Sequence, residues 1–176
     1  VYKRLSLSAA RPKIANYPFT TLTPHLGVVQ LDHERSFVLA DVPGLIAGAH
    51  EGHGLGLQFL SHLERTKVLV HVIDLSSESG RDPIEDFQVV CHELASYAGR
   101  HPEKEDAPRP NLEAKPQIVV ANKTDVLDNP ERLELLRKWL KPRSIELYPI
   151  SAVTGEGLDQ LREALWKAVS TNRGFL

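Results

Sequence analysis

A run of polar residues stands directly after an apolar stretch, 118–121, in the second half of the chain: Asn122, Lys123, Thr124 and Asp125. A short apolar run of residues that favour β-structure is typical of a buried parallel strand. Open α/β sheets bind their ligands at the carboxyl ends of the strands. The spacing therefore predicts that these four residues lie where a ligand would bind.

The four residue types suit a purine base that carries hydrogen-bond donors. A carboxylate such as that of Asp125 can accept two parallel hydrogen bonds, from N1–H and the 2-amino group of guanine, whereas adenine offers neither donor. A site built on that pairing can discriminate by roughly 10⁴-fold or more. Asn122 can donate towards the base or tie neighbouring loops together, and the stem of Lys123 can lie on the ring face. In the alternative interpretation the run is an ordinary turn, with Asp125 as a helix cap.

A second strand end carries small residues. The run 145–150 leads into Ser151, Ala152 and Val153. Residues of this size leave room for a backbone N–H to approach a ligand. We expect the N–H of Ala152 to point at a base carbonyl such as guanine O6.

The first part of the chain offers residues that suit a metal ion and phosphates. The apolar run 36–40 leads into Asp41, Val42, Pro43 and Gly44. An aspartate there can hold a water bound to Mg²⁺, as a Walker B aspartate does, and a glycine N–H can approach a phosphate closely. Upstream lies a proline-containing extended loop with Phe19, Thr20, Thr21, Leu22 and Thr23. A threonine hydroxyl in such a loop can ligate Mg²⁺, although a plain connector would have the same composition.

Composition bounds the class of protein. At 176 residues the chain fits one domain with a proper core, and its 41% apolar and 25% charged content is ordinary for a globular protein. The net charge of −2 gives no argument for nucleic-acid or membrane binding, and we interpret the local basic clusters as solvated surface. The single cysteine, Cys91, excludes an internal disulfide and suits a reducing compartment. Without a long apolar run or a visible signal peptide, we expect a cytoplasmic location.

Hydrophobic periodicity predicts alternating strands and helices. We expect strands over 26–31, 36–40, 68–74, 118–121 and 145–150, with a hairpin turn at 32–35. Helices are expected from Asp82 or Pro83 onward, near 130–140, and from Leu158 to Val169. His71 lies within a predicted buried strand, and we interpret it as a core residue whose polar atoms are satisfied. The pair His50 and His53 has no converging ligand pattern, so we do not predict a metal site there.

Taken together, a Thr-Thr loop, Asp-x-x-Gly, Asn-Lys-x-Asp and Ser-Ala-x occur in the order found in translation-factor-type P-loop GTPases. The match to one branch is closer. Residues 10–22 resemble the first switch region of the Obg family, and 41–49 with 54–56 resemble its second switch. Residues 62–66 and 151–157 continue the resemblance, which covers nearly the whole chain.

The resemblance implies an α/β fold: a three-layer, mostly parallel sheet of the P-loop GTPase type with helices on both faces. It implies GTP and GDP as ligands, with Thr21 on Mg²⁺ and Asp41 reaching the ion through water. Leu45 stands where many GTPases carry a water-orienting Gln, so the resemblance implies slow Mg²⁺-dependent GTP hydrolysis without a catalytic residue in this chain. It further implies a switch that works at the large ribosomal subunit or its RNA. We expect a monomer.

One element of the family pattern is absent from the printed sequence: the phosphate-binding loop G-x-x-x-x-G-K-[ST]. By spacing, its last residue would fall at Val1, and the first strand of the sheet would precede it. Hydrogen bonds to charged groups contribute roughly 1.5–3 kcal/mol each, so we expect nucleotide binding to be weaker by on the order of 10³-fold. We favour an Obg-type GTP-binding domain, 1–176, truncated at its amino end. The alternative is a natural short form that keeps the fold as a non-catalytic scaffold.

Overall fold

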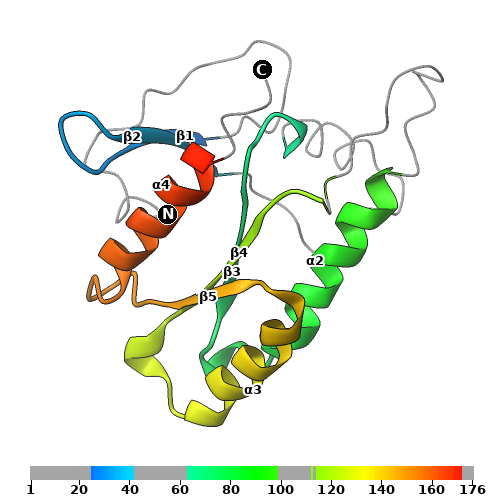
Figure 1. Ribbon diagram of the computed structural model, residues 1–176. Helices are drawn as coiled ribbons and strands as arrows, with labels where there is room; N and C mark the ends of the chain where they lie inside the picture. Colours follow the sequence, from blue (N-terminus) through cyan, green and yellow to red (C-terminus); the bar gives the residue numbers. More distant parts are fainter. Residues whose placement is uncertain (1–24, 42–62, 99–111, 113, 172–176) are drawn as a thin grey trace.

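The computed structural model describes residues 25–41, 63–98, 112 and 114–171 of the chain (Figure 1). Two sheets are formed by these residues. Strands β1 (His25–Gln30) and β2 (Ser36–Asp41) make an antiparallel hairpin. Strands β3 (Leu69–Asp74), β4 (Gln117–Asn122) and β5 (Glu146–Pro149) make a parallel sheet in that order.

The parallel sheet is the middle of three layers. On β4 the side chains of Ile118 and Val120 pack with α4 (Leu158–Thr171), whereas those of Val119 and Ala121 pack with α2 (Pro83–Ala98) and α3 (Pro130–Leu140). Successive side chains of a strand point to opposite faces, so a strand covered on both sides is apolar throughout. Figure 1 shows α4 on one side of the sheet and α2 with α3 on the other. The predicted α/β fold with helices on both faces is confirmed.

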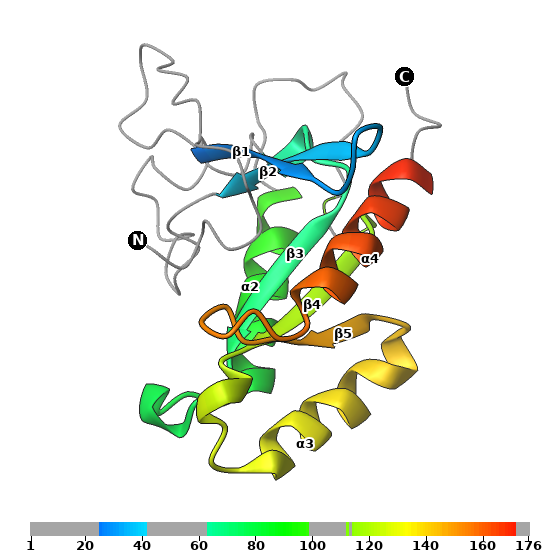
Figure 2. The same cartoon turned by 90° about the vertical axis from the view of Figure 1, so that its left-hand side faces the viewer.

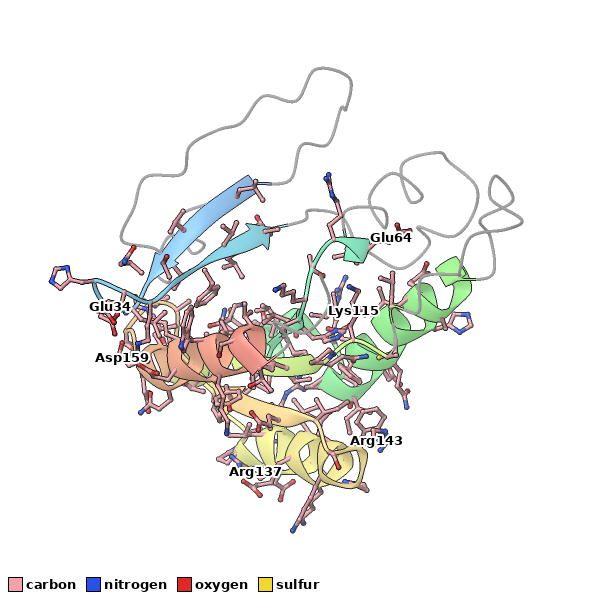
Figure 3. All side chains as sticks on the ribbon, turned by 45° about the horizontal axis from the view of Figure 1, so that its top comes forward. Glu34, Glu64, Lys115, Arg137, Arg143 and Asp159 are labelled. Carbon is pink, nitrogen blue, oxygen red and sulfur yellow. The ribbon has the colours of Figure 1, made fainter. Side chains whose placement is uncertain are left out.

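The hairpin packs over α4. Its inward residues Val29 and Phe37 are buried in the same cluster as Leu161 and Leu165 of that helix. At the turn, Arg35 makes paired hydrogen bonds of 2.8 and 2.9 Å to the carboxylate of Glu163 on α4. Figure 3 shows the turn, marked by Glu34, at the end of α4 that carries Asp159. The segment that ends in Asp41 is thus fixed to the carboxyl-terminal helix.

Among the described residues, β2 pairs only with β1 and β3 pairs only with β4. Two valines near these edges are largely exposed, Val38 on β2 (63%) and Val72 on β3 (66%). Within the described part of the chain, β2 and β3 each therefore present one edge to which no further strand pairs.

Local sequence sets the helix boundaries. The Asn129 side chain accepts a hydrogen bond of 3.0 Å from the N–H of Glu131, and Pro130 occupies the first position of α3. Asp82 plays the same part before α2, accepting from the N–H groups of Ile84 and Glu85. The predicted helices near 130–140, from Pro83, and from Leu158 are confirmed. The predicted strands agree with the observed ones to within two residues at each end.

Lys115, just before β4, donates a 3.0 Å hydrogen bond to the carbonyl of Glu64 and another to that of Thr66, and so ties the segment before β3 to the start of β4. Figure 3 shows Glu64 and Lys115 close together. Among the helices that the structure describes, none combines the length and apolar character needed to cross a membrane. Cys91 lies on α2 and packs, half-buried, against the core cluster that includes Phe87 and Leu136.

Candidate functional site

The carboxyl ends of β4 and β5 are joined by backbone hydrogen bonds that run past the strands themselves. The N–H of Ile150 donates to the carbonyl of Ala121 at 2.8 Å, and the N–H of Thr124 donates back to Ile150 at 3.1 Å. Both loops therefore leave the sheet side by side. In Figures 1 and 2 the loop 151–157 (orange) lies next to the short turn η3 (Thr124–Val126, yellow-green).

Side chains lock these two loops together. The hydroxyl of Ser151 donates to Oδ1 of Asp125 at 2.6 Å, and Oδ1 of Asn122 accepts from the N–H of Ala152 at 3.1 Å. The Ser151 side chain is fully buried, and its oxygen also accepts from the N–H groups of Val153 and Thr154. Buried polar groups need such partners, because an unpaired one costs roughly 1–3 kcal/mol. The structure thus brings together the two motifs that the sequence analysis singled out separately.

The interpretation of Asp125 as a helix cap is wrong. It lies inside η3, and the residue at the N-cap position of that turn is Lys123. Its carboxylate is turned towards Ser151 and stays exposed at the sheet edge. For Asn122 the two alternatives were base contact and loop tying, and its Oδ1 ties the loops. The N–H of Ala152, expected to point at a base carbonyl, donates to Asn122 in this structure.

The loop 151–157 depends on a glycine. The N–H of Gly155 donates to the carbonyl of Ser151 at 2.9 Å, and the N–H of Ser151 donates to Glu156 at 3.0 Å. Gly157 then returns the chain to α4 with a φ of +75°, where a Cβ would lie only 2.4 Å from the carbonyl oxygen of Pro149. Only glycine fits this close approach.

Lys123 has an unusual backbone and a charged partner. Its φ of 72° and ψ of 38° place it in the left-handed region, which a residue with a side chain adopts uncommonly. Its ammonium forms an ion pair with Oδ2 of Asp74 and donates to the hydroxyl of Ser76 at 3.3 Å. Because β3 and β4 are in register at Asp74 and Asn122, the two charged residues meet across neighbouring strand ends.

The ion pair shifts the pKa of both Asp74 and Lys123. Partial burial acts to raise the pKa of Asp74, but hydrogen bonds from Lys123 and Ser76 outweigh burial and hold that pKa below its usual range. The hydrogen bond to Asp74 raises the pKa of Lys123 above its usual value. Asp74 and Ser76 were not among the residues predicted from the sequence. The available signal was an aspartate at the end of β3, a strand with the same apolar pattern as β4.

Asp41 ends β2 and is half-buried. A carboxylate at a strand end supplies the oxygen ligand that Mg²⁺ prefers, so Asp41 fits a role beside that ion. Within the described part of the chain, no group of three or more His, Cys, Asp or Glu residues could hold a metal ion. The remaining predicted residues lie outside the described residues: Phe19, Thr20, Thr21, Leu22, Thr23, Val42, Pro43 and Gly44.

A three-layer α/β architecture with Asn-Lys-Thr-Asp and Ser-Ala at adjacent carboxyl strand ends defines the class of protein. It is the architecture of P-loop GTPases. Comparison with solved structures agrees. The chain matches Era from Aquifex aeolicus bound to GDP·AlF4⁻ with a TM-score of 0.62 and 25% identity, covering 95% of this chain and 52% of that one. It matches the cytosolic domain of FeoB from T. maritima with a TM-score of 0.63 and 19% identity, covering 98% and 59%, which concerns the fold alone.

Residues 3–123 match the family described as 50S ribosome-binding GTPase, and the chain belongs to this family. Among curated relatives, GTPase Obg of Solibacter usitatus is 54% identical over 159 residues, or 90% of this chain and 44% of that protein. GTPase Obg of Aquifex aeolicus is 51% identical over 161 residues, or 92% of this chain and 44% of that protein. The resemblance to the Obg family is confirmed. The chain spans less than half the length of these two relatives.

Proposed function

We propose that this chain is a guanine-nucleotide-binding switch domain with slow, Mg²⁺-dependent GTP hydrolysis, and that residues 1–176 form one Obg-type GTP-binding domain. One observation carries the proposal: the Ser151 hydroxyl holds Asp125, and Asn122 holds the Ala152 loop, at adjacent strand ends. A carboxylate fixed in this way presents its acceptors in one direction. Guanine, with two neighbouring donors, is the base that such a carboxylate selects.

The other base-side residues follow from the same placement. Lys123 and Thr124 lie between Asn122 and Asp125, and Val153 extends the facing loop with 67% of its surface exposed. An exposed apolar side chain beside a planar base would lose surface to it on binding, which favours association. We propose all of these residues, with Ser151 and Ala152, as the nucleoside side of the site.

The phosphate side rests on the sequence pattern together with Asp41. We propose that Asp41 holds Mg²⁺ through water, that Thr21 ligates the ion directly, and that Gly44 meets the γ-phosphate. The segments around Thr21 and Gly44 flank the β1–β2 hairpin in sequence. GTP would order both segments and hydrolysis would release them, as in other GTPase switches. The ion supplies charge stabilisation to the phosphates when bound.

The proposed partner is the large ribosomal subunit or its RNA. The description of the matched family as 50S ribosome-binding supports the large subunit. An Era structure that this chain resembles at 25% identity contains nucleotides of 16S ribosomal RNA, which belongs to the small subunit and supports only a ribosomal RNA partner in general. The relatives named GTPase Obg support an activity of the same kind. We further propose a cytoplasmic location and a monomeric state.

Substitution of Asp125 by Asn tests the base assignment. Asn keeps an oxygen that can accept from Ser151, so the loop contact survives, but it replaces one base-facing acceptor with a donor. We expect affinity for GDP to fall at least about tenfold and affinity for XDP to rise, since xanthine has a 2-oxo group in place of the 2-amino group. Affinities on the millimolar scale are measured by ligand-observed NMR titration. The matched control is Asp159→Asn, which removes a carboxylate on α4 that is 91% exposed and pairs with Arg162.

Unchanged GDP affinity in Asp125→Asn would refute the base-reading role. If the wild-type chain bound neither GDP nor GTP at millimolar concentration, the non-catalytic scaffold would replace the switch as the better interpretation of this chain.

A further inference from the structure

We propose that Asp74 and Ser76 are positioning residues of the base site, which fix the Lys123 ammonium at the end of β3 so that the lysine stem lies across the nucleoside edge. This inference rests on the proposed function. Neither residue belongs to the four sequence motifs from which the site was predicted. Each contacts Lys123 rather than the proposed ligand.

Both oxygens of the Asp74 carboxylate have partners. Its Oδ1 atom accepts from the N–H of Ser76 at 2.9 Å and from the Ser76 hydroxyl at 2.6 Å. Its Oδ2 atom pairs with the ammonium of Lys123. With one oxygen fixed by the backbone and hydroxyl of Ser76, the other has a defined direction. The carboxylate is therefore held in place before Lys123 reaches it.

The loop that carries Ser76 is itself fastened. Arg132 of α3 donates to the carbonyl of Leu75 at 3.1 Å and to that of Arg81 at 2.5 Å. The hydroxyl of Ser77 donates to Asp128 at 2.6 Å. The carbonyl of Asn122 also accepts from the N–H of Leu75 at 3.1 Å. The partner of Lys123 is thus attached to the same α3 region and strand end that position Asp125.

The backbone of Lys123 explains why a partner is useful. A residue with a side chain is destabilised in the left-handed region, and such strain persists where the surrounding structure imposes it. Its Cα follows β4 while its ammonium sits at the end of β3. The four-carbon stem therefore crosses from one strand end to the next. A stem held in this way offers an apolar surface to a base without first losing its rotamer freedom.

Removing the charge of Asp74 distinguishes the positioning of Lys123 from the recognition of the base by Asp125. In Asp74→Asn the side chain can still accept hydrogen bonds from Ser76, but it no longer attracts the ammonium by charge. Both side chains of the pair are about a third exposed or less, 28% for Lys123 and 32% for Asp74. A partly exposed pair contributes modestly, so we expect GDP affinity to fall about three- to fivefold. The GDP-to-XDP preference should stay unchanged, because Asp125 is untouched.

The experiment combines two measurements on the full chain. Affinity for GDP is measured by ligand-observed NMR in wild type, Asp74→Asn and the control Asp159→Asn, which removes a carboxylate on α4 that is 91% exposed and pairs with Arg162. Without nucleotide, the rate of reductive methylation of Lys123 is followed by peptide mass spectrometry over a range of pH, because only the unprotonated amine reacts. Loss of the Asp74 charge should speed methylation of Lys123 several-fold. Lys138 on α3 serves as an internal reference, and the control variant should leave Lys123 unchanged.

The proposal is supported if Asp74→Asn shows both faster methylation of Lys123 and weaker GDP binding, while Asp159→Asn shows neither change. GDP affinity equal to wild type overturns it, and so does an unchanged methylation rate. If the wild-type chain binds no GDP, the proposed function fails. Faster methylation of Lys123 in Asp74→Asn would then show a purely structural ion pair, which also overturns the inference.

Discussion

Replacement of Gly157 by alanine gives a sharp test of how the base-side loop is built. Gly157 and Gly155 lie in the same loop, both with positive φ, +75° and +86°. A Cβ on Gly155 meets nothing within 4 Å, whereas a Cβ on Gly157 lies 2.4 Å from the carbonyl oxygen of Pro149 and 3.1 Å from the Ile150 side chain. The two substitutions thus share the backbone strain and differ in the collision.

The magnitude follows from this difference. The left-handed backbone costs alanine roughly 1–2 kcal/mol at either position. At Gly157 the Pro149 carbonyl must also move by at least about 0.6 Å, the gap between 2.4 Å and the 3.0 Å below which Cβ contacts essentially do not occur. Overpacking of this kind costs roughly 1–3 kcal/mol. We therefore expect Gly157→Ala to lose about 2–5 kcal/mol and Gly155→Ala about 1–2 kcal/mol.

Urea unfolding and thermal melting measure both variants. One kcal/mol corresponds to roughly 2–4 °C in Tm for a chain of this size, so Gly157→Ala should melt about 2–12 °C below Gly155→Ala. Because Pro149 and Ile150 lead directly into Ser151, the displacement should also weaken GDP binding by more than the Gly155 variant does. Equal destabilisation of the two variants would refute the reasoning, since it would show that the loop relaxes freely.

Two other substitutions probe buried polar groups. Ser151→Ala removes the donor to Asp125 and should lower the free energy of unfolding by about 1–2 kcal/mol and weaken GDP binding. Ser170→Ala removes a half-buried hydroxyl that donates within its own helix, to the carbonyls of Trp166 and Lys167; because such bonds add little to helix stability, the free energy of unfolding should change by less than about 0.5 kcal/mol. Similar losses of the two variants in urea titrations would contradict this. Burial lowers the pKa of His71 from 6.5 to about 4 despite a hydrogen bond with Gln117. The unfolded chain then binds the proton more readily, so stability present above pH 6.5 should fall by about 2 kcal/mol between pH 7.5 and 5. His71→Gln should flatten that decline, and a parallel pH dependence in the two proteins would count against the assignment.

Burial of His71 also qualifies the prediction made for it. The residue is in the core, as expected, and packs edge-on against Phe87 at 4.8 Å between ring centroids. Its Nε2 atom is buried without a hydrogen-bond partner among the described residues, so the prediction that its polar atoms are satisfied is wrong for that nitrogen. A strand pattern predicts which side chains are buried, because period 2 sets the face. It carries no information on the partners available there.

The elements of the fold were predictable because their signals are local. Apolar runs of strand length, leucines at helical spacing and a polar motif after each strand predicted β4, β5, α3 and α4 close to their observed bounds. The resemblance to Obg proteins depended on the same short segments, and the family comparison confirmed it. Residue types at fixed short spacing suffice for predictions of this kind.

Which side chains of the site contact one another could be seen only in the tertiary structure. Ser151 and Asp125 are 26 residues apart, and Lys123 reaches Ser76 across 47. Whether such side chains meet depends on which strands are neighbours and on the register between them, Asp74 beside Asn122 and Ala121 beside Pro149. The apolar pattern of a strand sets which face each side chain takes, but the register between strands distant in sequence also depends on how both sheet faces pack against α2, α3 and α4. The sequence by itself determined the strand ends and their chemistry, and only the fold decided that Asp74 and Ser76 act on Lys123.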